Sequence, residues 1–298
     1  MISGLILLNK EPGITSFDAL RDIKRALGTG KVGHTGTLDK FAQGLLVILT
    51  GRALKLSRWF SHCDKKYTGR IHFGIETDTL DPEGEVIAQA EIPCREEVEK
   101  ALKVFTGEIK QAPPAYSAIH INGKRASSLV RAGQAPEMKK RQVTVYKLEL
   151  VSWQPPFAEI FVHCSSGTYI RSLARDIALA VNSRGYLDAL TRTQVAGFEL
   201  SHKMPHTKAQ RHKEEINFIR PIDKEVVGFL GMPWFEVTPQ EAKNIFHGKP
   251  LTPVFDNKQL FSPQTVHSIK AAAVFSGEEL IAVVENDSGQ WKYGCVLS

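Results

Sequence analysis

The stretch GHTGTLD at residues 33–39, followed by GLLVILTG at residues 44–51, is the most informative part of the chain. Gly33 and Gly36 have no Cβ, so they allow tight turns and a close approach of the backbone to other groups. The second stretch is typical of a short buried strand. Such a loop can hold Asp39 at the edge of a sheet, within reach of a ligand. An aspartate after a glycine-rich loop is more often a turn or cap residue, so both interpretations stay open from this pattern alone.

Length and composition describe an ordinary globular protein. The chain has 298 residues, of which 42% are hydrophobic and 23% charged, and this length allows more than one domain. Aliphatic runs such as residues 45–49 are too short to cross a bilayer, and residues 5–8 are too short for the core of a signal peptide. We therefore expect no membrane contact and a cytoplasmic location. The four scattered cysteines predict neither a disulfide framework nor a zinc knuckle.

Basic residues are concentrated in the first part of the chain. Residues 1–230 hold 33 Lys and Arg against 25 Asp and Glu, whereas residues 231–298 hold 5 against 7. Between residues 120 and 147 there are seven basic residues and one acid, Glu137. Such a run is usually a solvated face. Glycines and Pro136 interrupt it here, which favours a mobile basic arm over about residues 115–141 that holds a nucleic-acid backbone through phosphate contacts.

Periodicity predicts an α+β fold with a mixed, mainly antiparallel sheet. Thr15 and Ser16 can cap a helix that Gly28 ends, and Asn122-Gly123 predicts a hairpin turn. We expect strands over 4–9, 44–51, 66–74, 142–153, 158–164 and 194–200, and helices over 52–62, 95–105 and 169–181. Residues 201–230 are expected to form an irregular connection. Residues 231–298 are expected to form a second, small β-rich domain with strands over 280–284 and 291–297.

Two further places can carry chemistry. The segment SSGTYIRS at residues 165–172 places Arg171 at the start of a helix, where backbone N–H groups favour anions and a guanidinium fork suits a carboxylate or phosphate. Its alternative is a capped helix start with an exposed arginine. Tyr67 lies in a strand after two lysines; it is either a packing residue or a ring that stacks on a base. No histidine or cysteine spacing predicts a metal site.

In combination, these segments resemble the TruB family, the bacterial synthases that make pseudouridine in the T-loop of tRNA. The similar segments follow in order at residues 33–39, 66–67, 112–118, 166–173 and 187–197. Residues 231–298 resemble a PUA domain, an RNA-binding module. The resemblance implies a pseudouridine-synthase catalytic domain over residues 1–230 and a PUA-like domain after it.

The resemblance also implies roles for individual residues. Asp39 matches the catalytic aspartate, Tyr67 the tyrosine that stacks on the target uracil, and Arg171 the arginine that pairs with the aspartate. His34, Tyr169 and Leu190 match residues that line the pocket or contact the substrate RNA. We also expect Lys10 to bind the substrate, and we expect the same of Lys139, Lys140 and Arg141 in the basic arm. The chain departs from the family pattern at Lys40, where proline is common, at Gln43, where a small residue is common, and at Thr191, where arginine is typical. It also departs at residues 10–13, which read KEPG where the family pattern is Lys-Pro-x-Gly.

The implied activity is the isomerisation of uridine to pseudouridine at position 55 of tRNA. Substrate and product are isomers, so we expect no cofactor and no metal. The target base must be flipped out of its stack before Asp39 can reach it. We expect the T-arm of tRNA as the partner, no required protein partner and a monomer. Two alternatives remain: a subunit of an RNA-guided synthase, and a non-catalytic protein that binds or folds tRNA.

Overall fold

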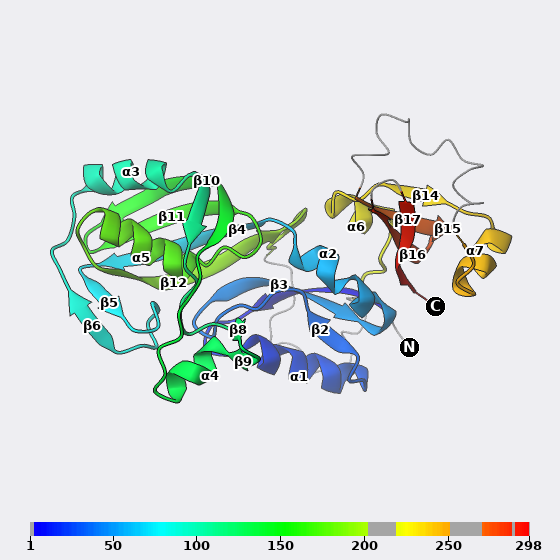
Figure 1. Cartoon of the computed structure of the whole chain (residues 1–298), viewed down its shortest axis with the longest axis horizontal. Coiled ribbons are helices and arrows are strands. Elements are labelled where there is room, and N and C mark those ends of the chain that lie inside the picture. Colours follow the sequence, from blue (N-terminus) through cyan, green and yellow to red (C-terminus); the bar gives the residue numbers. More distant parts are fainter. Residues whose placement is uncertain (1–2, 202–218, 251–269, 288–289, 298) are drawn as a thin grey trace.

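A nine-stranded sheet forms the main body of the protein (Figure 1). The computed structural model describes residues 3–201, 219–250, 270–287 and 290–297. The strand order is β1-β3-β12-β4-β11-β10-β7, with β2 added to β3 and β13 added to β12. The bounds are β1 (Gly4–Lys10), β2 (Val32–His34), β3 (Gln43–Thr50), β4 (Lys65–Phe73), β7 (Gly107–Gln111), β10 (Arg141–Gln154), β11 (Phe157–Cys164), β12 (Gly185–Val195) and β13 (Phe198–Glu199).

The pairing confirms the expected mixed, mainly antiparallel sheet. Among the described strands of this sheet, only β12 and β3 pair in parallel, and this pair joins the two halves of the sheet. β3 is buried from Gly44 to Thr50, as its continuous apolar sequence predicts. β4 instead alternates between buried and more exposed positions, which gives it one face toward the core.

The helices cover the sheet in two groups. Helix α1 (Ser16–Leu27) begins with Thr15 in a capping box with Asp18 and ends at Gly28, whose φ of 61° is left-handed. Its buried side chains pack on β1 and β3 in one core cluster. Helices α3 (Arg95–Val104) and α5 (Ile170–Ala180) pack on β4, β10, β11 and β12 in another. The 3₁₀ helix η1 (Gly51–Leu56) and helix α2 (Ser57–Ser61) replace the single helix that was expected over 52–62.

Short elements complete this part of the chain. Strands β5 (Ile75–Thr77) and β6 (Val86–Gln89) pair with each other. Strands β8 (His120–Ile121) and β9 (Lys124–Arg125) form a hairpin followed by helix α4 (Ala126–Arg131). The predicted turn is confirmed, because Asn122 and Gly123 both have positive φ.

The C-terminal region contains a separate four-stranded sheet, in the order β14-β15-β16-β17. Its elements are helix α6 (Lys224–Phe229), β14 (Trp234–Glu236), helix α7 (Pro239–Phe246), β15 (Ala271–Ser276), β16 (Glu279–Asp287) and β17 (Gln290–Val296). Phe275 and Leu280 lie in the same core cluster as Leu45 and Leu49 of β3. The two sheets therefore share buried apolar surface.

The sequence-based prediction was wrong over residues 185–200. The expected strand near 194–200 is the end of the longer β12 and the short β13, and β12 is the strand that pairs with β3 where the halves of the sheet meet. Two register shifts interrupt its pairing with β4 and disturb the alternation that marks a strand. Helix α6 lies in the region expected to be irregular, while residues 202–218 are outside the described part. None of the described helices combines the length and apolar composition needed to cross a bilayer.

Candidate active site

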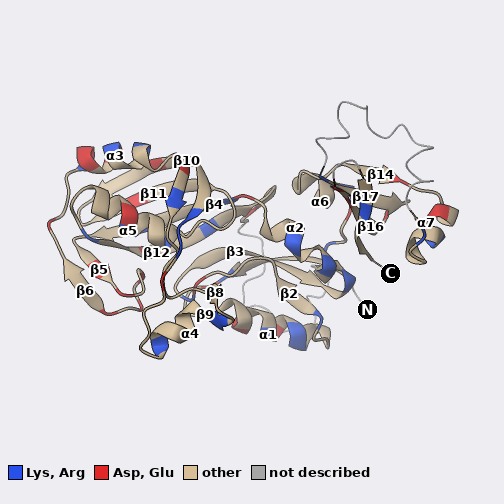
Figure 2. Ribbon diagram, in the orientation of Figure 1, with Lys and Arg blue, Asp and Glu red and all other residues tan. Residues whose placement is uncertain are grey.

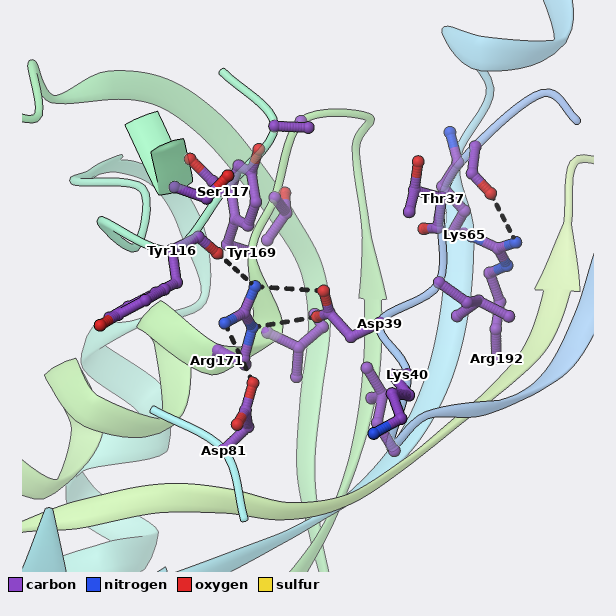
Figure 3. A pocket seen from close by; sticks show the side chains of 18 of the residues that line it. Thr37, Asp39, Lys40, Lys65, Asp81, Tyr116, Ser117, Tyr169, Arg171 and Arg192 are labelled. Carbon is purple, nitrogen blue, oxygen red and sulfur yellow. Dashed lines mark hydrogen bonds and ion pairs between the residues drawn. The ribbon is translucent and has the colours of Figure 1, made fainter. Parts of the chain in front are cut away.

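A cavity of about 520 Å³ lies where the two halves of the main sheet meet the basic arm. Its lining comes from the loop between β2 and β3, from β4 and β12, from residues 116–131, and from the start of α5. Figure 3 shows Asp39 and Arg171 facing each other in this cavity, with Lys65 and Arg192 on the other side of Asp39. We call residues 35–42 the Asp39 loop.

Neighbouring polar groups fix the backbone of the Asp39 loop. The Thr35 N–H donates to Val47 O at 3.0 Å. Leu38 N donates to Ser16 Oγ at 2.9 Å, and the Ser16 hydroxyl donates to Leu38 O at 3.0 Å. The start of α1 therefore holds the residue that precedes Asp39.

Lys10 supports the same loop from within the protein. It is fully buried, and its ammonium group donates to Glu11 O, Ile14 O and Lys40 O at 2.9, 2.8 and 3.4 Å. Burial lowers its pKa to about 8. In this position Lys10 holds carbonyl groups of the protein, which differs from the substrate-binding role that was expected for it.

Arg171 joins the Asp39 loop to the rest of the cavity. It is the second residue of α5, and only 4% of its surface is exposed. Its Nε lies 3.0 Å from Asp39 Oδ2, and its Nη2 donates to Asp39 Oδ1 at 3.1 Å. This two-point contact is the geometry in which a guanidinium fixes the plane of a carboxylate. Nη2 also donates to Tyr116 O at 3.0 Å, which ties the base of the arm to the same group.

A second carboxylate, which sequence reasoning did not identify, contacts the same guanidinium. Arg171 Nη1 lies 3.1 Å from Asp81 Oδ2, and Asp81 is 5% exposed. Thr79 Oγ1 donates to Asp81 Oδ1 at 2.6 Å, and Glu83 N donates to the same oxygen at 3.0 Å. In sequence, DPEG at residues 81–84 gives only a turn signal, and the aspartate indeed makes turn hydrogen bonds while it also orients Arg171.

The electrostatic environment raises the pKa of Asp39. Burial is the main cause, and the negative charge of Asp81 adds to it. Arg171 and Lys10 act in the opposite direction and favour the ionised form. The carboxylate is therefore held in a fixed orientation and is more basic than a free aspartate.

Tyr67 lies on β4 with 8% of its surface exposed and lines the cavity. Burial raises the pKa of its phenol to about 12, and the nearby charge of Asp39 also raises it. The positive charge of the nearby Arg192 opposes this shift. The phenol therefore remains protonated at neutral pH.

The other predicted pocket residues divide into two groups. Tyr169 and Leu190 line the cavity. His34 ends β2 and is partly buried; burial, and then the charge of Arg192, lower its pKa, so the imidazole is neutral at pH 7. The described cavity lining does not include His34 or Lys10.

The arm contributes different basic residues from those predicted. Arg125 and Arg131 line the cavity, whereas Lys139, Lys140 and Arg141 are exposed and lie outside its described lining. The basic residue of α4 appears blue in Figure 2. The sequence could not separate these two sets, because all five belong to one run of basic residues.

Two of the residues that depart from the family pattern contact each other. Gln43 Nε2 donates to Thr191 Oγ1 at 3.0 Å across the parallel pair of β3 and β12. Lys40, which also departs from the pattern, forms an ion pair with Glu83 at 2.9 Å, and both side chains are about half exposed at the cavity. Each of these three residues thus has a partner in the folded chain.

No metal site is found in the described ranges: no group of three or more His, Cys, Asp or Glu side chains is placed to hold an ion. The charged groups at the centre of the cavity, Asp39, Asp81 and Arg171, instead pair with one another.

Comparison with known proteins gives one family. Residues 24–170 match the family model described as TruB family pseudouridylate synthase, N-terminal domain. The tRNA pseudouridine synthase B of Borreliella burgdorferi strain ZS7 is 47% identical over 203 residues, which cover 67% of this chain and 72% of the relative. The enzyme of the same name from Francisella philomiragia is 35% identical over 294 residues, with 97% and 93% coverage.

Solved structures show the same fold at lower identity. The crystal structure of a Cbf5–Nop10–Gar1 complex contains a chain with a TM-score of 0.68 and 22% identity, covering 95% of this chain and 78% of that one. A chain in an H/ACA ribonucleoprotein bound to a substrate RNA containing 2′-deoxyuridine gives a TM-score of 0.67 at 22% identity, with 95% and 77% coverage. At these identities the likeness concerns the fold.

Proposed function

Because the chain belongs to the TruB family of pseudouridylate synthases, we propose that it isomerises uridine to pseudouridine in the T-loop of tRNA, at position 55. The observation that carries this proposal is the cavity in which Arg171 fixes the Asp39 carboxylate at 3.0 and 3.1 Å, with Tyr67 in the same lining. The near full-length similarity to tRNA pseudouridine synthase B of Francisella philomiragia supports the substrate class.

In this proposal the reaction needs only groups of the chain and the RNA. The bond between N1 and C1′ of uridine breaks, the uracil turns, and C5 forms a new bond with C1′. The C5 proton is then lost and N1 gains a proton, so atoms and electrons balance without an external reagent. Asp39 acts in its ionised form as nucleophile or base. Arg171 holds it in the reactive orientation.

Tyr67 is proposed to receive the flipped base. Removing uracil from its stack costs free energy, and stacking on an aromatic ring offsets this by about 1–3 kcal/mol per base. Its neutral phenol, with a pKa raised to about 12, suits a ring that contacts a neutral base. Tyr169 and Leu190 are proposed to border the same base, because both line the cavity. His34 is proposed to contact RNA beside it.

We further propose two functional parts: residues 1–230 as the catalytic domain and residues 231–298 as a PUA-like RNA-binding domain. The separate four-stranded sheet supports this division, although α6 packs in the core cluster that joins both parts. Arm residues about 115–141, including Lys139, Lys140 and Arg141, are proposed to bind phosphates of the T-arm. The working unit is proposed to be a monomer without a required protein partner.

The test is to incubate the purified chain with unmodified tRNA and map pseudouridine along it. The expected product is pseudouridine at position 55 without any added guide RNA or protein. Activity that appears only with a guide RNA would support the RNA-guided alternative. Tight tRNA binding with no pseudouridine at any position would support the non-catalytic one.

A further inference from the structure

Arg192 is a buried arginine that differs from Arg171 in its partners. It is 2% exposed and lines the cavity. Its Nε donates to Leu45 O at 2.7 Å, its Nη2 to Gly36 O at 3.0 Å and its Nη1 to Thr37 O at 3.5 Å. Among the described residues no carboxylate forms an ion pair with it. Burial lowers its pKa, so keeping this cation inside the folded chain costs free energy.

The position of Arg192 in the sheet places its guanidinium between β3 and β4. Arg192 lies on β12 directly opposite Tyr67 on β4 and opposite Gly44 on β3. Gly44 has a φ of 103°, and a Cβ at this position would lie 2.4 Å from Arg192 O. The two backbones are therefore in close contact at the only parallel pair of the described main sheet, and Arg192 spans that junction.

Arg192 lies next to both groups whose relative position the reaction needs. Its guanidinium donates to the carbonyls of Gly36 and Thr37 at the start of the Asp39 loop. It is also the cross-strand neighbour of Tyr67, both side chains line the cavity, and the Arg192 charge acts to lower the pKa of the phenol. The loop leads into β3 and the tyrosine lies on β4, and these strands flank β12 on either side. The donors of a guanidinium are spread over three nitrogens in one rigid plane, so they can reach groups on both sides of β12, whereas the donors of an ammonium group all lie on one nitrogen.

We propose that Arg192 is a positioning residue that fixes the phenol of Tyr67 relative to the Asp39 carboxylate. The expected effect on the reaction rate rests on the proposed function. The position of Arg192 beside Tyr67 does not depend on which RNA is the substrate. Arg192 acts on the reaction through Tyr67 and the Asp39 loop. Its contribution to tRNA affinity is expected to be small, because Arg192 is 2% exposed and each of its three nitrogens donates to a carbonyl of the protein.

The experiment compares Arg192→Lys with Arg184→Lys. The control makes the same chemical change one residue before β12, where the Arg184 side chain is 40% exposed and pairs with Glu76 at 3.2 Å. Single-turnover rates on tRNA and Kd are measured for both. Arg192→Lys is expected to lower the rate about 10–100-fold, as for a misplacement of about 1 Å, with Kd within about threefold of wild type. Arg184→Lys is expected to change neither.

A double-mutant cycle tests the route through Tyr67. In a Tyr67→Phe background the phenol oxygen is gone, so the effect of Arg192→Lys on the rate is expected to shrink to about threefold or less. An equally large effect in both backgrounds would overturn the proposal, as would a loss that appears only in Kd.

A second readout needs no RNA. With ¹³Cζ-tyrosine in the chain, the Tyr67 signal is identified by its absence in Tyr67→Phe. Arg192→Lys is expected to shift this signal at neutral pH, whereas Arg184→Lys leaves it in place. If Arg192→Lys fails to fold, Arg192→Gln, which keeps amide donors but no charge, replaces it in both measurements. An unshifted signal overturns the proposal. A wild-type chain that makes no pseudouridine in tRNA overturns the proposed function instead, and the Tyr67 signal still decides the contact.

Discussion

The cavity and the arm beside it differ in how their charges are satisfied. In the cavity, Arg171 lies within 3.1 Å of the carboxylates of both Asp39 and Asp81, and it is 4% exposed. In the arm, Lys139, Lys140 and Arg141 are exposed, and the described residues provide no ion pair for them. The groups proposed for chemistry are thus oriented before RNA arrives, whereas the groups proposed for affinity remain free to bind phosphate.

The largest effect is expected for Asp39→Asn, which tests whether the cavity supplies the chemistry and the arm supplies the affinity. Removing the charge while keeping the shape should lower turnover by at least about 10³-fold, because the proposed nucleophile or base is absent. Affinity for tRNA should stay within about threefold, because the arm is untouched. Release of tritium from C5-labelled uridine and a binding assay measure the two quantities. Asp176→Asn on α5, which removes a partner of Arg175 at 2.7 Å, is the matched control. Near-normal turnover in Asp39→Asn would contradict the assignment.

Asp81→Asn should have the next largest effect and also a distinct pH signature. Asp81 orients Arg171, so we expect turnover to fall about 10–100-fold. Because the folded pKa of Asp39 is raised, the ionised form is lost as pH falls through a higher value than for a free aspartate. The charge of Asp81 contributes to that rise. Its removal should therefore lower the pKa of Asp39 and move the acid limb of the pH–rate profile to lower pH. An acid limb that stays in place or moves upward would contradict this electrostatic explanation.

Substitutions in the arm should change affinity and spare the chemical step. Replacing Lys139, Lys140 and Arg141 by Gln should weaken tRNA binding and flatten the slope of log K against log salt by about 0.7–0.9 for each phosphate that is no longer neutralised. The single-turnover rate at saturating enzyme should remain as in wild type. The same measurements on Arg125→Gln and Arg131→Gln, which alter the cavity-lining part of the arm, show whether that part contributes to affinity in the same way. A salt slope equal to that of wild type in the triple variant would remove these residues from the RNA interface.

The smallest effect is expected for the ion pair at the cavity edge. Lys40 and Glu83 have side chains that are 51% and 43% exposed, so water screens their attraction. Glu83→Gln should change the free energy of unfolding by less than about 1 kcal/mol. Urea unfolding measures this change. A larger loss of stability would mean that the Lys40–Glu83 pair is coupled to the buried ion pairs of Asp39, Asp81 and Arg171.

The sequence predicted the parts of this arrangement that depend on local patterns. The glycine-rich loop before Asp39, the capped helix after Thr15 and the Asn122-Gly123 turn each require particular residues at particular positions, and each was found. The pairing of Asp39 with Arg171 was inferred only through the family resemblance, since 132 positions separate the two residues.

Asp81 and Arg192 were missed for physical reasons. Asp81 carries a turn signal, and nothing local indicates that its second oxygen meets a helix 90 residues away. Arg192 lies on β12, where register shifts on both sides of residues 189–192 break the alternation of a strand. Partners that are distant in sequence, such as Leu45 for Arg192, come together only through the order of strands in the sheet.

The burial of strand β3 against the C-terminal region has a consequence for any attempt to remove that region. One end of β3 leads from the Asp39 loop, while Leu45, Val47 and Leu49 are buried in a cluster with Phe275, Leu280 and Val283. Lys55 and Arg58 also donate to Val296 O and Gly294 O at 2.7 and 3.0 Å. A chain cut after residue 230 would expose this shared apolar surface to water. Lower activity of such a chain could therefore come from weaker packing of β3, which follows the Asp39 loop, as well as from a lost RNA contact.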